Sequence, residues 1–374
     1  MRESVKDLKG GAKRVRSSNL ELYRIITMLM IIAHHYVVNS NVWSVVQENP
    51  TEANSYFMLL FGAWGKTGIN CFVFITGWFM CKSSISLNKF LKLVTQVWFY
   101  SIVFYILFGL AGAMPFTLTN TINVLLPVKN MNSGFTSAFI VFYLFIPFLT
   151  VWVRNLTQRE HLMLAGLCLL VFTVGGSMPR FVSVTVNYVV HFGVLFIIAS
   201  YIRFHGFPVR VTHRGWGWLT LLSLLLSAAS VLVMHTLLAR RGGSSSGIDP
   251  YFFISDSNKI LAMTTALCSF MWFKDLKLRH VPLINALGGA TFGVLLIHAN
   301  SNAMRQWLWN DTVDCAGHFT DPYLWLYAPG VVLLIFAVCA AIDIARKRWL
   351  EDSIVGAAHR VVQALPLPGR CRRG

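Results

Sequence analysis

Charged side chains are scarce in this chain of 374 residues, and acidic ones are the scarcest. Only 13% of the residues are charged, against about 25% in soluble domains. The chain has 15 Asp and Glu residues against 32 Lys and Arg residues, while 55% of its residues are hydrophobic. This small number of charged residues cannot cover the water-exposed surface of a soluble fold. The composition therefore excludes an ordinary soluble domain.

Several functional signatures are missing as well. The seven cysteines are scattered, and no pair has zinc-site or redox spacing, so we expect no metal. The basic residues lie in short gaps between apolar runs, and we therefore expect no binding of nucleic acid. The first apolar run begins at Leu20 with no small-residue cleavage site behind it, which predicts no cleavable signal peptide. No internal repeat is visible, so the inverted-repeat pattern of many transporters is absent.

What the chain has instead is ten long apolar runs. A membrane-spanning helix needs about 20 mostly apolar residues, and each run is close to that length. We therefore predict an all-α, polytopic bundle of about ten transmembrane helices. The runs cover residues 20–38, 56–80, 90–113, 134–153, 161–178, 184–203, 216–238, 259–274, 286–303 and 323–345.

The basic residues in the gaps between these runs predict the orientation. Counted in alternate gaps and tails, 24 Lys and Arg residues fall on one side and six on the other. Cytoplasmic loops carry the excess, so we expect both termini in the cytoplasm. The prediction divides the chain into a basic cytoplasmic segment (1–19), a transmembrane domain (20–348) and a basic cytoplasmic tail (349–374). That tail either lies along the inner leaflet or is disordered, and segment 240–250 is predicted to be an outer loop.

The first apolar run carries ionisable residues that are costly inside a bilayer and therefore point to function. Arg24 and His35 are eleven residues apart, which places them within about 20° of each other on a helix and about 16 Å apart along its axis. Glu21 precedes Arg24 by three residues and can pair with it. One helix face thus presents a cation near the cytoplasm and a titratable base deeper in.

Structural alternatives exist for each of these residues. Arg24 can be an interfacial anchor, and His35 can be a histidine bonded to a neighbouring helix. The ninth run places His298 in the same outer half of the bilayer as His35, so the two could meet in one pocket. His191 shares that half, but we expect no direct role for it. Tyr143 is expected to pack.

Four segments carry motifs in a fixed order. These are Glu21-Leu-Tyr-Arg24 followed by ten residues and His35, Thr76-Gly77-Trp78, Tyr143-Leu144 with Pro147-Phe148-Leu149, and Phe292 to His298. Together they resemble the acyltransferase-3 family of membrane proteins, which includes bacterial polysaccharide O-acetyltransferases. The chain departs from the family pattern at Thr76 (commonly Ser), Trp78 (commonly Tyr) and Leu295 (commonly Tyr).

The resemblance implies transfer of an acyl group, usually acetyl from acetyl-CoA, to a hydroxyl of an envelope carbohydrate. It implies a multi-pass protein of the bacterial cytoplasmic membrane with no permanently bound cofactor. The expected partners are the acyl-CoA donor, a carbohydrate acceptor that can be lipid-linked, membrane lipids and the machinery of polysaccharide synthesis.

The resemblance also suggests roles for single residues. His35 would be a general base or would carry the acyl group covalently for a moment. Arg24, supported by Glu21, would hold a phosphate of CoA. The remaining candidates would bind substrate, stabilise the oxyanion or orient His35, and they are Asn70, Thr76, Gly77 and His298.

Two other classes of function compete with this one. A transporter or flippase of a lipid-linked or anionic small molecule would also use intramembrane Arg and His residues, along its translocation path. Broken helices or paired halves would favour it, and the sequence shows neither clearly. A membrane recognition or sensing domain without catalysis would keep its function when His35 is replaced.

Overall fold

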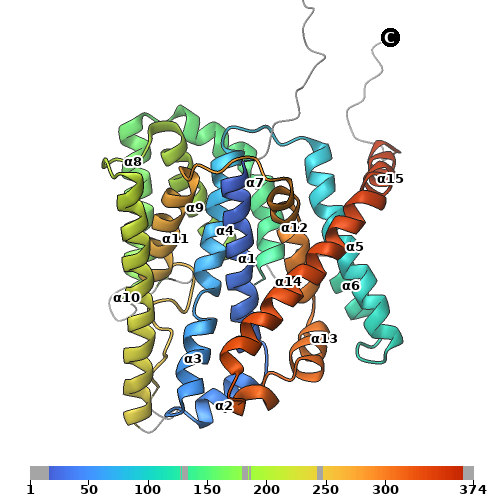
Figure 1. Cartoon of the computed structure of the whole chain (residues 1–374). Helices are drawn as coiled ribbons and strands as arrows, with labels where there is room; N and C mark the ends of the chain where they lie inside the picture. Colours follow the sequence, from blue (N-terminus) through green and yellow to red (C-terminus); the bar gives the residue numbers. More distant parts are fainter. Residues whose placement is uncertain are drawn as a thin grey trace, which may run out of the picture.

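Helices account for all the regular structure that the computed structural model describes (Figure 1), which confirms the predicted all-helical membrane bundle. The predicted segments 1–19 and 349–374 lie only partly within the described residues. The structure describes residues 17–126, 128, 134–178, 184, 187–241 and 247–364.

Eight of the described helices are long and apolar enough to cross a membrane. They correspond to the first seven predicted runs and to the tenth. In chain order they are α1 (Ser18–Val38), α3 with α4 (Ala53–Gly62 and Gly65–Met80), α5 (Leu87–Leu110), α7 (Phe135–Asn155), α8 with its continuations η1 and η2 (Gln158–Ser177), α9 (Tyr188–His205), α10 (His213–Arg240) and α14 (Leu324–Trp349).

The two other predicted runs differ from regular membrane-spanning helices. Helix α11 (Ile260–Lys274) has 15 residues, which is short for a bilayer. Helix α12 (Pro282–His298) is followed, after a 96° bend, by a helical segment over Asn302–Thr312, made of α13 and η4. By length and composition the described residues therefore contain eight spans, or nine with the bent pair, against the predicted ten.

The bend between α12 and α13 does not interrupt the hydrophobic run in the sequence. The predicted ninth run, 286–303, passes straight through it. The backbone of Ser301 is extended, and its hydroxyl accepts a hydrogen bond from the amide of Met304, which starts α13 as a new helix. Shorter helices complete the chain, namely α2 (Val42–Glu48), α6 (Leu118–Leu125), η5 (Gly317–Thr320) and α15 (Glu351–Ala364).

Helix α10 shows why this bundle belongs in lipid. Its small polar residues Thr220, Ser223 and Ser227 recur on one face and are buried, and the Ser227 hydroxyl lies 3.3 Å from that of Thr265 on α11. The opposite face exposes leucines, Leu225 among them. This is the reverse of a soluble amphipathic helix, and small residues at helix contacts are typical of membrane bundles.

Helix α1 lies at the centre of the bundle, in contact with α4, α11, α12 and α14 (Figure 1). The side chain of Asn19 donates to the carbonyl of Phe273 at the end of α11, and Ser18 donates to the side chain of Asn285 in the first turn of α12. Helices α1 and α12 therefore begin at the same end of the bundle and run parallel. Their C-terminal residues meet at the other end.

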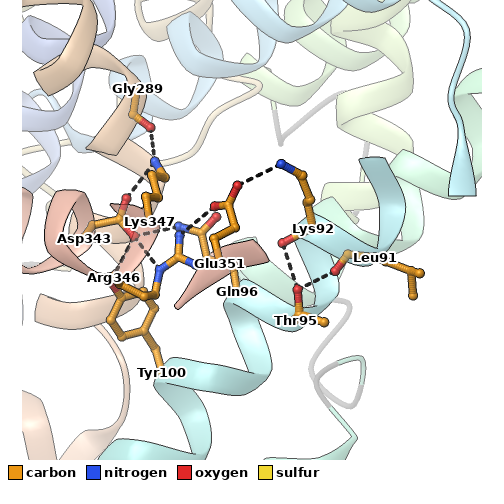
Figure 2. Close-up of polar contacts among 10 residues, drawn as sticks. All are labelled: Leu91, Lys92, Thr95, Gln96, Tyr100, Gly289, Asp343, Arg346, Lys347 and Glu351. Atoms are coloured by element: carbon orange, nitrogen blue, oxygen red, sulfur yellow. Dashed lines mark hydrogen bonds and ion pairs between the residues drawn. The ribbon is translucent and has the colours of Figure 1, made fainter. Parts of the chain in front are cut away.

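A buried carboxylate joins three of the helices, α14, α5 and α12 (Figure 2). Asp343 of α14 is fully buried and accepts hydrogen bonds from Gln96 and Tyr100 of α5. On its own helix it pairs with Arg346 at 3.0 Å and Lys347 at 2.8 Å. Lys347 also reaches α12, where it donates to a backbone carbonyl. Since all these groups leave water together, the network depends on every partner.

The same network continues to the last helix. Arg346 reaches Glu351 of α15 at 3.4 Å, and Glu351 also pairs with Lys92 of α5 at 3.0 Å. Helix α15 thereby packs against the start of α5 at the edge of the bundle (Figure 1). The first turns of the predicted tail 349–374 are therefore helical, and they contact the bundle.

Orientation in the membrane stays a prediction and can be tested with reporters. The excess of Lys and Arg places the ends of the chain in the cytoplasm. A reporter fused after Arg348 is expected to be active only in its cytoplasmic form, and one inserted near Ser245, outside the described residues, is expected to behave as external. The opposite pattern at either position contradicts the predicted topology.

Replacing the buried carboxylate should destabilise the bundle strongly. Asp343→Asn leaves Arg346 and Lys347 without their shared charge partner, and we expect the free energy of unfolding to fall by about 3 kcal/mol or more. Unfolding in detergent micelles measures this loss. Lys92→Gln is the matched control, since its side chain is 44% exposed and such pairs contribute about 1 kcal/mol or less. Equal losses in the two variants would contradict the role of Asp343.

Candidate active site

Two histidines from different helices meet where α1 and α12 end. His35 lies in the last turn of α1, and His298 is the last residue of α12. The Nδ1 atom of His35 is 3.0 Å from the Nε2 atom of His298, and His298 is fully buried. The structure thus brings together the two residues that the sequence analysis allowed to share a pocket.

The hydrogen bonds of His298 decide which nitrogens carry protons when both rings are neutral. Its Nδ1 atom lies 2.6 Å from the carbonyl oxygen of Val294, and a carbonyl can only accept, so this Nδ1–H donates. The Nε2 atom of neutral His298 therefore accepts, and the Nδ1–H of His35 is the donor. The Nε2 atom of His35 is left with its lone pair, as a general base requires.

A cavity of about 490 Å³ lies beside His35. Its wall is built from residues of α1, α4, α5, α6, α7, α9, α12 and α13. A volume of this size is typical of a small-molecule site. The lining includes the titratable and polar side chains of His34, His35, Lys66, Ser101, Tyr188 and Arg305.

Two cations in this lining were not predicted as site residues. Lys66 of α4 donates to the hydroxyl of Tyr188 at 2.7 Å and lies 3.6 Å from a carboxylate oxygen of Asp256. Arg305 is the last residue of α13. The sequence analysis counted Arg305 with the outer gaps and passed over Lys66 within the second apolar run. A lysine inside an apolar run is itself a functional signal.

Glycines of α4 let α1 approach closely enough to shape the cavity. A Cβ atom on Gly65 would lie 2.2 Å from the ring of His34, and one on Gly68 would lie 2.9 Å from the side chain of Ile31. The Nδ1–H of His34 donates to the carbonyl oxygen of Gly62 at 2.6 Å. The ring of His34 is thus fixed against the backbone of the α3–α4 region.

Arg24 lies toward the opposite end of α1. It pairs with Glu21 at 3.1 Å, as the spacing predicts, and Glu21 is buried. A Cβ on Gly288 of α12 would lie 2.6 Å from a carboxylate oxygen of Glu21, so α12 closes over this pair. Arg24 does not line the cavity of His35, since eleven helical residues separate them by about 16 Å.

Further cations gather around the C-terminal end of α4, near Arg24. The Arg203 guanidinium lies 4.2 Å from the ring centre of Trp78, and the Lys274 ammonium lies 5.7 Å from the same ring. Arg24 itself lies 5.8 Å from the ring of Phe79. A helix C-terminus favours positive charge, and aromatic faces bind cations. This end of the bundle is therefore strongly electropositive.

Asn70 is buried beside the site without lining the cavity. Its amide nitrogen donates to the carbonyl oxygen of Ser257 at 2.7 Å, and its amide oxygen lies 2.8 Å from Nε2 of His191. The Asn70 side chain thus joins α4 to α9 and to the segment before α11. His191, which was expected to have no direct role, orients Asn70.

Thr76 and Gly77 make helix contacts outside the cavity. The Thr76 hydroxyl donates to the carbonyl of Phe72 in its own helix, at 3.0 Å. A Cβ on Gly77 would lie 2.9 Å from the Cβ of Ala199, so this glycine allows α4 and α9 to touch. Neither residue lines the cavity that contains His35.

Comparison with known proteins gives one match. The model of an acyltransferase domain family, acyltransferase-3, matches residues 17–344, nearly the whole chain, and this confirms the resemblance seen in the motifs. No curated protein and no solved structure matches the chain.

The proton positions in the histidine pair can be measured directly. In protein with ¹⁵N-labelled histidine, at a pH where both rings are neutral, we expect protons on Nδ1 of both His35 and His298. The two Nε2 nitrogens should have the chemical shifts of unprotonated imidazole, because each Nδ1–H has an acceptor. Variants lacking one histidine assign the signals. A protonated Nε2 on neutral His35 would contradict the hydrogen-bond chain.

Proposed function

Since the chain belongs to the acyltransferase-3 family, we propose that it transfers an acetyl group from cytoplasmic acetyl-CoA to a hydroxyl of an envelope carbohydrate in the bacterial cytoplasmic membrane. The observation that carries this proposal is the hydrogen-bond chain from Val294 through His298 to His35. It leaves a lone pair on His35 next to a cavity of about 490 Å³. That arrangement suits a base acting on a bound hydroxyl.

In the proposed reaction, Nε2 of His35 takes the proton of the acceptor hydroxyl while the oxygen attacks the carbonyl carbon of the thioester. The carbon–sulfur bond breaks, and the thiolate of CoA recovers the proton from His35. His298 accepts the hydrogen bond from Nδ1–H of His35, which holds the tautomer and stabilises the transient imidazolium. A covalent acetyl-histidine on the same nitrogen is the alternative path, with two transfers in place of one.

The predicted oxyanion residues need reassignment within this proposal. The donor groups of Asn70 and Thr76 are already bonded to protein carbonyls, and neither residue lines the cavity. Lys66 lines the cavity and carries a positive charge, so in our proposal it stabilises the developing oxyanion. In this proposal the role of Asn70 is structural, since its side chain is bonded to His191 and Ser257.

The donor would enter from the end of the bundle where α1 begins. Arg24 is tied to Glu21 and has a side chain that is 22% exposed, and a planar guanidinium suits a phosphate group. Arg203 and Lys274 stand over Trp78 close by. We propose that these cations hold the charged end of acetyl-CoA, while its thioester reaches toward His35.

A second function is favoured by one observation. The 96° break between α12 and α13 lies next to His298, and broken helices are typical of transporters that bind their substrates near the bilayer midplane. In this second reading the chain moves a lipid-linked or anionic small molecule across the membrane. Translocation would then continue in a variant that has no base at position 35, so the two functions can be separated.

Loss of the base should abolish acetylation. We expect His35→Ala and Arg24→Ala to lower the acetyl content of the envelope glycan to background, and His298→Ala to lower the rate by about 10²- to 10⁴-fold, the range of general-base catalysis. Mass spectrometry of released glycan, and transfer of labelled acetyl in isolated membranes, measure these effects.

Two controls make the result specific. Thr76→Val removes a hydroxyl that is bonded within its own helix, so acetylation should persist in this variant. All variants must accumulate in the membrane at similar levels. Unchanged acetyl content in His35→Ala rules out the proposed chemistry, and continued translocation in that variant favours the transporter.

A further inference from the structure

Arg305 is a half-buried cation with no ion pair among the described residues. It follows the break after α12 and lines the cavity that contains His35. Its Nε atom is buried and has no hydrogen-bond partner. The internal residues outside the description, which are 127, 129–133, 179–183, 185–186 and 242–246, include no Asp or Glu in the sequence.

Lys66 provides the contrast within the same cavity. Its ammonium group already has Tyr188 at 2.7 Å and Asp256 at 3.6 Å. Half of the positive charge of the cavity is therefore matched by a protein carboxylate, and the charge of Arg305 is not. A guanidinium that lines a cavity without a carboxylate partner is free to bind an anionic group of a ligand.

A substrate group with a permanent negative charge would neutralise Arg305 at all times, whereas a charge that forms only during the reaction would not. The oxyanion of acyl transfer exists only during the reaction, whereas the guanidinium is charged throughout. The thioester end of acyl-CoA is uncharged. The remaining molecule that enters the cavity in the proposed reaction is the acceptor.

We propose that the acceptor is anionic and that Arg305 binds its carboxylate or phosphate group. This inference rests on the proposed function, because it assigns the cavity beside His35 to the acceptor. A guanidinium binds either group through two parallel hydrogen bonds. The acceptor would then be a sugar unit that carries a uronate or a phosphate near the hydroxyl that is acetylated.

The test measures binding without turnover. Diethyl pyrocarbonate acylates an unprotonated imidazole nitrogen, and peptide mass spectrometry reads the extent of labelling at His35. The protein is held in nanodiscs of phosphatidylcholine, and the probes are glucuronate, glucose 6-phosphate and glucose. We expect the two anionic probes to protect His35, and glucose at equal concentration to give no protection. The stronger of the two anions identifies the carboxylate or the phosphate as the natural group.

Variants assign the protection to Arg305. In Arg305→Gln the concentration for half-protection should rise about tenfold or more, as loss of a charge-assisted bidentate contact implies, and Arg305→Lys should lie between. The matched control is Arg240→Gln, at the exposed end of α10 on the same side of the bundle as Arg305. In this variant the concentration for half-protection of His35 should equal that of the wild type. Circular dichroism confirms that each variant is folded.

Several outcomes would overturn the inference. Equal protection by glucose, no protection by any probe, or unchanged protection in Arg305→Gln each contradict it. If nanodiscs that contain phosphatidylglycerol protect His35 without any sugar, the anion is a lipid headgroup. If Arg305→Gln slows acetyl transfer but keeps protection, Arg305 serves the oxyanion. The protection results do not depend on turnover by His35, so failure of the proposed function appears separately, as acetylation that survives His35→Ala.

Discussion

The hydrogen bond from Nδ1–H of His298 to the carbonyl oxygen of Val294 sets the chemistry of the site. A helix carbonyl cannot donate, so this bond determines the tautomer of His298, and His298 in turn determines that of His35. The bond exists because His298 ends α12, one turn after Val294. The acid–base chemistry proposed for the cavity follows from the single lone pair that this chain of bonds leaves on His35.

The bundle separates two kinds of positive charge along one helix. Near the start of α1, Arg24 lies close to the cations at the end of α4. Near its end, Lys66 and Arg305 line the cavity beside His35. Two anionic substrates approaching from opposite ends would each meet a cation first and the base second. Such an arrangement positions two reactants without requiring either to cross the membrane.

Hydrophobicity and helical periodicity predicted most of the fold and part of the site. Eight of the ten apolar runs correspond to membrane-length helices among the described residues, and the spacing of Glu21 and Arg24 predicted their pairing. Side chains whose roles depend on neighbours were harder to predict. Thr76 bonds within its own helix, and Lys66 meets Asp256, 190 positions away in the sequence. Contacts of that kind leave no periodic trace, and neither did the extended Ser301 that separates α12 from α13.

The ion pairs of Asp343 have a consequence for biogenesis. Arg346 and Lys347 lie three and four positions after it, so α14 carries its own counter-ions (Figure 2). A newly made α14 can therefore leave the translocon with its carboxylate already neutralised. Gln96 and Tyr100 of α5 are synthesised some 240 residues before Asp343. Until α14 docks, their side chains face lipid or water, and after docking they donate to the carboxylate. Docking of α14 against α5 thus completes the polar contacts of both helices.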